Sequence, residues 1–173
     1  MALLTSMRRS AAFLAIVLLS ASVDAAVGVG DRAPEFVLAT RDGGSFTPAA
    51  LRGRVVLLDF WASWCSLCTQ ALPRLDAIAR RHAAEGLVVV AVGIDRDAKT
   101  AERFLAERVP DPAMTMLRDP DGALLARFGA PGMPALYLLD RNGIVRMVEA
   151  GYAPDRLERV EAEVEKLFTK PSP

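Results

Sequence analysis

Apolar residues follow one another almost without a break in two stretches of the chain. The run 55–60 is interrupted only by Asp59, and the run 87–94 contains no charged side chain. A continuous apolar run of this length is typical of a strand that is buried on both faces, as in parallel sheets covered by helices. The pattern therefore predicts an α/β protein with a central sheet between helices.

Apolar residues at helical spacing predict the helices that cover this sheet. In the first of them, Leu72, Leu75 and Ile78 share one face, and Gly86 follows as a stop signal. The expected helices are 66–84, 97–108, 123–128 and 154–168, with a single helical turn over 47–51.

Short strands joined by turn sequences predict two hairpins. Asp-Gly and Asn-Gly pairs supply the backbone conformations that tight hairpin turns need. One such pair begins at Asp42 and the other at Asn142. The expected strands are 36–39 with 45–46, and 135–139 with 144–150. A further short strand is expected over 114–117.

The first 25 residues have the pattern of a signal peptide. Arg8 and Arg9 precede the apolar stretch 11–20, and small residues near Ala25 offer a cleavage site. The uncharged stretch is shorter than the roughly 20 residues that span a bilayer, so an uncleaved anchor is the less favoured alternative. We expect export to the periplasm and one domain over 26–173.

Charge and histidine content exclude several classes of protein. The chain has 21 Lys and Arg residues against 21 Asp and Glu residues, and it has no basic stripe. Nucleic-acid binding is therefore not expected, and we expect a monomer. The single histidine, His82, argues against a histidine-based hydrolase. It follows Arg80 and Arg81 on the polar side of a predicted helix, so we expect it to be exposed to solvent.

The two cysteines, Cys65 and Cys68, stand where the first apolar strand gives way to a helix. The first turn of a helix has unpaired N–H groups and the positive end of the helix dipole, which stabilise a thiolate. A Cys-X-X-Cys pair in this position has a lowered thiol pKa. Because a disulfide across two residues closes a very short loop, it stabilises the fold little. Redox chemistry is therefore favoured over a structural disulfide or a metal site.

The run 59–68, DFWASWCSLC, followed by Pro73, resembles the active-site segment of the thioredoxin superfamily. The run 132–140 resembles the loop and strand where that superfamily has a cis-proline facing the cysteines. The segments 30–38 and 51–54 resemble its exported TlpA/ResA-type branch, and the likeness covers about 28–168. The resemblance implies a thioredoxin-like fold, a central mixed β-sheet flanked by helices, with an N-terminal hairpin and a central strand and helix insertion.

The resemblance also implies a thiol:disulfide oxidoreductase. Such a protein would reduce disulfides in exported proteins, for example apocytochrome c or copper-site assembly factors, with electrons from a membrane thiol relay. No cofactor or metal is expected besides the redox-active disulfide Cys65–Cys68. Cys65 lies nearer the exposed helix end and is the expected nucleophile, and Cys68 would resolve the mixed disulfide.

Asp59 matches the buried acid of thioredoxin, which accepts the proton of the second cysteine. The alternative is a structural carboxylate whose hydrogen bonds are satisfied, since burial without a partner is costly. Thioredoxin pairs its acid with a lysine on the neighbouring strand, and the strand 88–94 has none. TlpA/ResA-type proteins often have a glutamate three residues after the second cysteine, and this position is occupied by Ala71 here.

Pro134 is expected to be the cis-proline, and Met133 before it is expected to form strand-like hydrogen bonds with a bound polypeptide. Trp64 is expected to contact a client beside the redox pair. Because two thiolates and a methionine are soft ligands, a Cu(I)-binding metallochaperone is the alternative function. A peroxiredoxin, suggested by the run 33–36, is disfavoured because that family has threonine at the position of Cys65.

Overall fold

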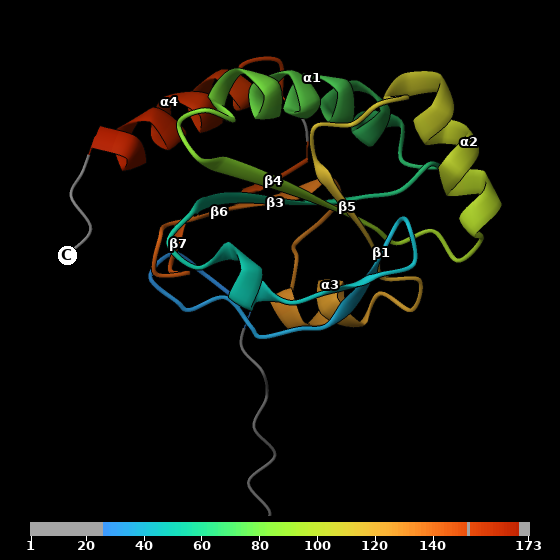
Figure 1. The fold of residues 1–173 in the computed structure, drawn as a ribbon, viewed down its shortest axis with the longest axis horizontal. Coiled ribbons are helices and arrows are strands. Elements are labelled where there is room, and N and C mark those ends of the chain that lie inside the picture. Colours follow the sequence, from blue (N-terminus) through green and yellow to red (C-terminus); the bar gives the residue numbers. More distant parts are fainter. Residues whose placement is uncertain (1–25, 152, 170–173) are drawn as a thin grey trace, which may run out of the picture.

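The computed structural model describes residues 26–151 and 153–169, in which seven strands form one mixed sheet (Figure 1). The strand order is β2-β1-β5-β4-β3-β6-β7. The pairs β3 with β4 and β4 with β5 are parallel, and the other neighbouring pairs are antiparallel. The strands are β1 (Leu38–Thr40), β2 (Ser45–Phe46), β3 (Val55–Trp61), β4 (Leu87–Gly93), β5 (Thr115–Arg118), β6 (Ala135–Leu139) and β7 (Val145–Ala150).

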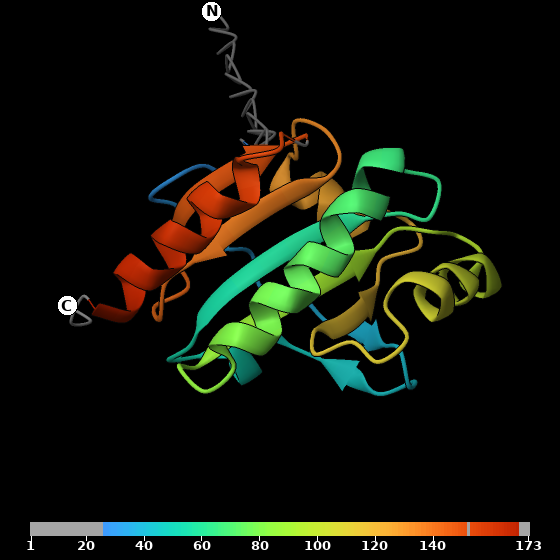
Figure 2. The same cartoon turned by 90° about the horizontal axis from the view of Figure 1, so that it is seen from above.

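Helices cover both faces of this sheet (Figures 1 and 2). On one face lie α1 (Ser66–His82), α2 (Ala98–Arg108) and α4 (Arg156–Thr169); on the other lie α3 (Ala123–Phe128) and the short 3-10 helix η1 (Pro48–Leu51). Each layer between sheet and helices contains its own apolar cluster. Apolar burial of this kind is the main force that holds the layers together.

The central strand β3 divides its side chains between these two clusters. Successive side chains of a strand point to opposite faces. Val56, Leu58 and Phe60 therefore contact the layer of α3. Val55, Leu57 and Trp61 contact the layer of α1 and α4. By the same alternation, Asp59 points into the layer beneath α1 and α4.

The structure confirms the predicted fold class and its elements. Both hairpins form, and α3 occupies the predicted residues 123–128. Helix α1 ends at His82, two residues earlier than predicted, and Gly86 follows it with a φ of 95°. Strand β1 begins at Leu38 instead of residue 36, and the ring of Phe36, which precedes the strand, stacks on that of Phe46.

The Met133–Pro134 peptide bond is cis, as predicted. Among the described residues, no helix is both long enough and apolar enough to cross a membrane. The predicted signal peptide, residues 1–25, lies outside the described part of the chain.

The prediction for His82 is wrong, because this side chain is buried. Its Nε2 lies 2.8 Å from a carboxylate oxygen of Glu161 on α4, and its Nδ1 forms a hydrogen bond with Glu85. The ring also packs against Phe168. Helical spacing in fact places His82 on the buried face of α1, four residues after Ile78 and seven after Leu75, and α4 covers that face.

Candidate active site

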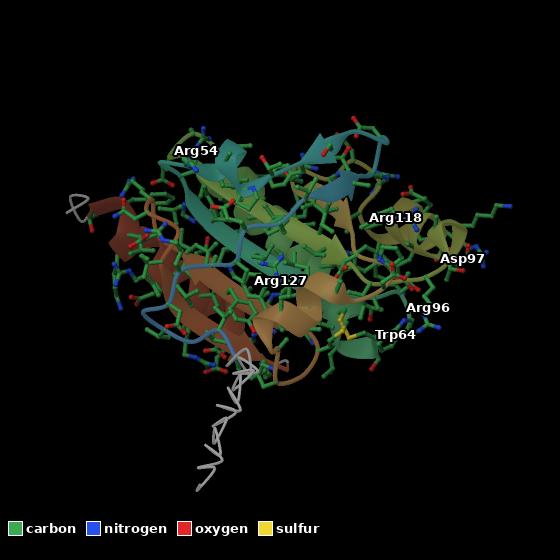
Figure 3. The ribbon with its side chains drawn as sticks, turned by 90° about the horizontal axis from the view of Figure 1, so that it is seen from below. Arg54, Trp64, Arg96, Asp97, Arg118 and Arg127 are labelled. Carbon is green, nitrogen blue, oxygen red and sulfur yellow. A yellow bond between two sulfur atoms is a disulfide. The ribbon has the colours of Figure 1, made fainter. Side chains whose placement is uncertain are left out.

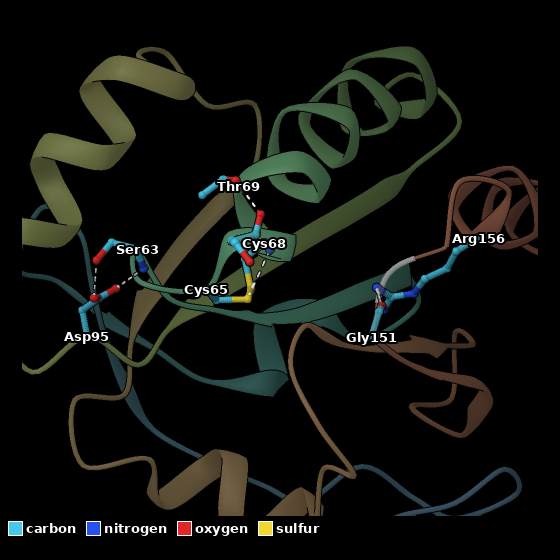
Figure 4. Close-up of a disulfide and its surroundings, with 8 residues drawn as sticks. Ser63, Cys65, Cys68, Thr69, Asp95, Gly151 and Arg156 are labelled. Carbon is cyan, nitrogen blue, oxygen red and sulfur yellow. Dashed lines mark hydrogen bonds between the residues drawn. A yellow bond between two sulfur atoms is a disulfide. The ribbon is translucent and has the colours of Figure 1, made fainter.

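Cys65 and Cys68 form a disulfide at the N-terminus of α1 (Figure 4). Cys65 caps the helix, and the backbone N–H of Cys68 donates a hydrogen bond to the Cys65 sulfur at 3.2 Å. This donor and the helix dipole would stabilise a thiolate on Cys65 once the disulfide is reduced. Cys65 is 8% exposed and Cys68 is 1% exposed, so an incoming group reaches Cys65 first.

The loop before the disulfide is held by Asp95, which follows β4. Its carboxylate accepts two hydrogen bonds from Ser63, from the backbone N–H at 2.9 Å and from the hydroxyl at 2.6 Å (Figure 4). Sequence reasoning missed Asp95. The signal was available, because the carboxyl ends of the parallel strands β3 and β4 meet at one edge of the sheet.

Trp61, the last residue of β3, packs against residues of β4 and α2. Its ring stacks on Phe104 of α2, with ring centroids 5.3 Å apart. A Cβ atom at Gly93 would lie 3.1 Å from the Trp61 ring, tighter than ordinary contact, so a glycine there lets the ring lie close to β4. The β4–α2 connection therefore braces the redox loop from one side.

Apolar side chains surround the accessible sulfur. Trp64 is 69% exposed and Leu67 is 37% exposed, and Trp64 lies beside the disulfide at the surface (Figure 3). Met133 is half-buried and packs against the core cluster that contains both cysteines, and Pro134 is buried. Trp64 thus lies beside the disulfide, Met133 packs against the cluster that contains both cysteines, and Pro134 precedes Ala135, which pairs with Phe60 near the end of β3.

Asp59 is buried, and neither of its carboxylate oxygens has a hydrogen-bond partner. In register it stands between Ala91 of β4 and Leu136 of β6, neither of which carries a charge. Burial raises the pKa of Asp59 to about 7, against the opposing positive charge of Arg156. A carboxyl group with this pKa can bind or release a proton near neutral pH.

Arg156, the first residue of α4, is also buried. Its two terminal nitrogens donate hydrogen bonds to the carbonyl oxygens of Gly151 and Glu149, and its Nε has no partner. Sequence reasoning missed this residue too. It lies four residues before Val160 on the apolar face of the helix, and a charge on that face was a usable signal.

Unpartnered buried polar atoms gather in this one layer. Among the described residues, the buried side-chain nitrogen and oxygen atoms without a hydrogen-bond partner are Asp59 Oδ1 and Oδ2, Trp61 Nε1 and Arg156 Nε. In the same part of the chain, no three His, Cys, Asp or Glu side chains are grouped to hold a metal ion. His82 is at the far end of the 17-residue α1, roughly 25 Å from Cys65, so it cannot join the cysteines in a metal site.

A pair of bonded cysteines at the start of the helix that follows the central strand, together with a cis-proline, defines a thioredoxin-like redox protein. The chain belongs to the Redoxin family, whose profile matches residues 28–166. It is 30% identical to the thiol-disulfide oxidoreductase ResA of Geobacillus thermodenitrificans over 126 residues, which cover 73% of this chain and 71% of the relative. It is 33% identical to the thiol:disulfide interchange protein DsbE of Escherichia coli over 145 residues, covering 82% and 75%.

Solved structures agree with this assignment. A Chlorobium tepidum protein assigned as the thiol:disulfide interchange protein DsbE superposes with a TM-score of 0.78 at 35% identity, covering 83% of this chain and 99% of that one. These similarities confirm the predicted thioredoxin-like fold, the resemblance to the ResA type and the class of enzyme, a thiol-disulfide oxidoreductase.

Proposed function

We propose that this protein reduces disulfides in exported proteins of the bacterial cell envelope. One observation carries the proposal: of two bonded cysteines at a helix N-terminus, only Cys65 borders the surface, and Cys68 lies deeper in the layer that holds the unpartnered Asp59. This arrangement separates a nucleophile from a resolving thiol and gives the resolving thiol a nearby proton acceptor.

In the first step, the Cys65 thiolate attacks one sulfur of the client disulfide. A bond forms between Cys65 and that client sulfur, the client disulfide breaks, and the other client sulfur leaves as a thiolate that takes a proton from water. The N–H of Cys68 and the positive end of α1 favour the attacking thiolate.

In the second step, Cys68 resolves the mixed disulfide. Asp59 accepts the proton of the Cys68 thiol, and the Cys68 thiolate attacks the Cys65 sulfur. The Cys65–Cys68 disulfide forms, and the second client sulfur leaves as a thiolate. Two electrons have then passed to the client, and a membrane thiol relay must return the pair to the dithiol form.

Client binding is assigned to Trp64, Met133 and Pro134. The exposed ring of Trp64 offers an apolar contact beside Cys65, and the backbone at Met133 pairs with an extended client segment. Suitable clients are apocytochrome c or a copper-site assembly factor. The N-terminal pattern over 1–25 supports export to the periplasm, and the protein acts as a monomer.

Two cysteine variants test the assigned roles. Cys65→Ser is expected to abolish turnover, whereas Cys68→Ser is expected to accumulate a mixed disulfide between Cys65 and the client, visible on a non-reducing gel. An adduct that forms through Cys68 when Cys65 is absent would reverse the assignment.

The reduction potential of the pair, measured by equilibration with glutathione, tests the direction of electron flow. A value near or below roughly −270 mV is expected for a reductase, and a value near −120 mV would identify an oxidant instead. A pair that does not cycle between dithiol and disulfide would overturn the proposal in favour of Cu(I) binding.

A further inference from the structure

We propose that Arg156 is a positioning residue for this chemistry, because its buried guanidinium group holds Asp59 in the charged form that accepts a proton from Cys68. The inference rests on the proposed function in one respect, namely that charged Asp59 accepts the proton of Cys68 during disulfide exchange. The coupling between the two side chains can be measured without any client.

The burial of Arg156 needs an explanation. A guanidinium group stays charged at every physiological pH, and a buried charge is costly unless it is compensated. Hydrogen bonds to the carbonyl oxygens of Gly151 and Glu149 use only part of its donors. A neutral amide side chain offers donors for such bonds as well, so these bonds alone do not account for a positive charge in the core.

The charges around the pair single out Asp59 as the compensating group. Glu149 of β7 also acts on Arg156, but it lies 3.5 Å from the nitrogen of Arg159, a second cation on α4. The residues paired with Asp59 in the sheet are Ala91 of β4 and Leu136 of β6, and neither carries a charge. The α1 residues in the apolar cluster of this layer, among them Cys68 and Leu72, are uncharged in the disulfide form as well. The charged group that acts on Asp59 is therefore Arg156 on α4.

Asp59 and Arg156 make no direct hydrogen bond, since both carboxylate oxygens and the arginine Nε lack partners. Their coupling acts through the apolar core, where charges interact more strongly than in water. Burial pushes the pKa of Asp59 upward, and Arg156 restrains that rise. Without Arg156, a larger share of the carboxyl groups would be protonated at neutral pH, and fewer of them could accept a proton from Cys68.

The position of Arg156 is fixed from the redox site itself. The carbonyl oxygen of Gly151 accepts a hydrogen bond from Arg156 (Figure 4). The N–H of Gly151 donates one to the carbonyl oxygen of Pro134 at 2.9 Å. The backbone of one residue, Gly151, thus connects the guanidinium group with the cis-proline loop. This connection holds the charge in a constant place relative to the layer of Asp59.

The test compares Arg156→Gln, which removes the charge and keeps amide donors, with Arg156→Lys, which keeps the charge. The titration of Asp59 is followed by carbon NMR of labelled aspartate carboxyl groups in the oxidised protein, and Asp59→Asn identifies its signal. We expect the midpoint to rise by about one pH unit or more in Arg156→Gln and to stay near the wild-type value in Arg156→Lys. Equal midpoints in wild type and Arg156→Gln would overturn the proposal, as would an equal rise in both variants.

Folding of the variants provides a second criterion. If Arg156→Gln does not fold, the double variant Asp59→Asn/Arg156→Gln is expected to fold, because it leaves no uncompensated carboxylate in the core. Failure of the double variant to fold would show that Arg156 serves only the structure and would overturn the proposal.

Kinetics then separate this inference from the proposed function. In Arg156→Gln, the pH at which release of the mixed disulfide accelerates is expected to move upward, and in an Asp59→Asn background the same substitution is expected to have no further effect. An intact coupling in a protein that does not reduce disulfides would contradict the proposed function alone.

Discussion

The layers under the two ends of helix α1 differ in whether their buried polar groups have hydrogen-bond partners. At the N-terminal end, the layer under the disulfide contains Asp59, Trp61 and Arg156, each with an unpartnered buried atom. Toward the other end, His82 contacts two glutamates, and Asp140 accepts hydrogen bonds from two backbone N–H groups and from Arg146. A buried polar group without a partner lowers stability. The unpartnered Asp59 at the redox end is therefore consistent with the proposed role in proton transfer, whereas the satisfied groups at the other end stabilise the fold.

The same contrast appears in the pKa values of two aspartates. Burial dominates at Asp59 and raises its pKa to about 7. At Asp140, burial also acts to raise the pKa, but the N–H groups of Ile144 and Asn142 and the charge of Arg146 outweigh it, and the pKa is lowered. The two carboxyl groups should thus affect stability with opposite dependence on pH.

The largest expected effect is that of Asp59→Asn on the pH dependence of the free energy of unfolding. The pKa of Asp59 is about 7 in the folded protein and near 3.8 when unfolded, so the unfolded chain loses its proton first as pH rises. The contribution of Asp59 to the free energy of unfolding therefore falls by about 3 kcal/mol between pH 5 and pH 8. Asp59→Asn should lack this fall, as measured by urea denaturation of the oxidised proteins.

Exposed Asp121 offers a control for this measurement. Asp121→Asn should keep the pH dependence of the wild type. If Asp59→Asn also keeps it, the unpartnered carboxyl group does not have the raised pKa assigned to it, and the contrast between the two ends of α1 is lost.

His82→Gln should destabilise the fold by about 2 kcal/mol at pH 6. Burial disfavours the charged ring, but hydrogen bonds and charges of Glu85 and Glu161 outweigh this effect and raise the pKa of His82. The stabilisation is complete below pH 6.5, the value of the unfolded chain, and is lost as pH rises through the folded value. Thermal unfolding at pH 6 and pH 9 measures this difference.

The rate of disulfide exchange should be unchanged in His82→Gln, since the residue lies at the far end of α1. A loss of stability that is equal at pH 6 and pH 9 would show that the charged ring is not the stabilising form. A large loss of exchange activity would break the division between a functional and a structural end.

The smallest expected effect is that of Asp140→Asn, which should lower the free energy of unfolding by about 1 kcal/mol at pH 7. Because the folded pKa is lowered, the stabilisation is present above the ordinary value of 3.8 and disappears as pH falls through the folded value. Urea denaturation at pH 7 and pH 3 checks the sign. If Asp140→Asn is more stable than the wild type at pH 7, the carboxylate of Asp140 does not stabilise the fold, and the contrast with Asp59 is wrong.

Local sequence signals predicted most of the fold. Apolar runs, helical spacing and turn pairs depend on neighbouring residues, and they located β3, β4, α3 and the two hairpins to within one or two residues. The position of Cys65 and Cys68 between strand and helix followed from the same signals.

Contacts between distant segments were not predicted. The partner of His82 on α4, Glu161, depends on how α4 packs across α1, and the cation near Asp59 comes from the start of α4 instead of the neighbouring strand. The hydrogen bonds from Ser63 to Asp95 likewise connect segments that follow two different strands. Each of these requires knowledge of which elements meet in space, which periodicity within one segment does not contain.

The most direct test of the account is the rate at which Cys68 resolves a mixed disulfide on Cys65, measured by stopped flow against pH in wild type and Asp59→Asn. We predict that the wild-type rate has an inflection near pH 7, from the pKa of Asp59. We also predict that Asp59→Asn loses this inflection and is about 100-fold slower at pH 7, the scale of general base catalysis. Identical profiles in the two proteins would contradict the account, because the unpartnered carboxyl group beneath the disulfide would then take no part in the transfer of the proton.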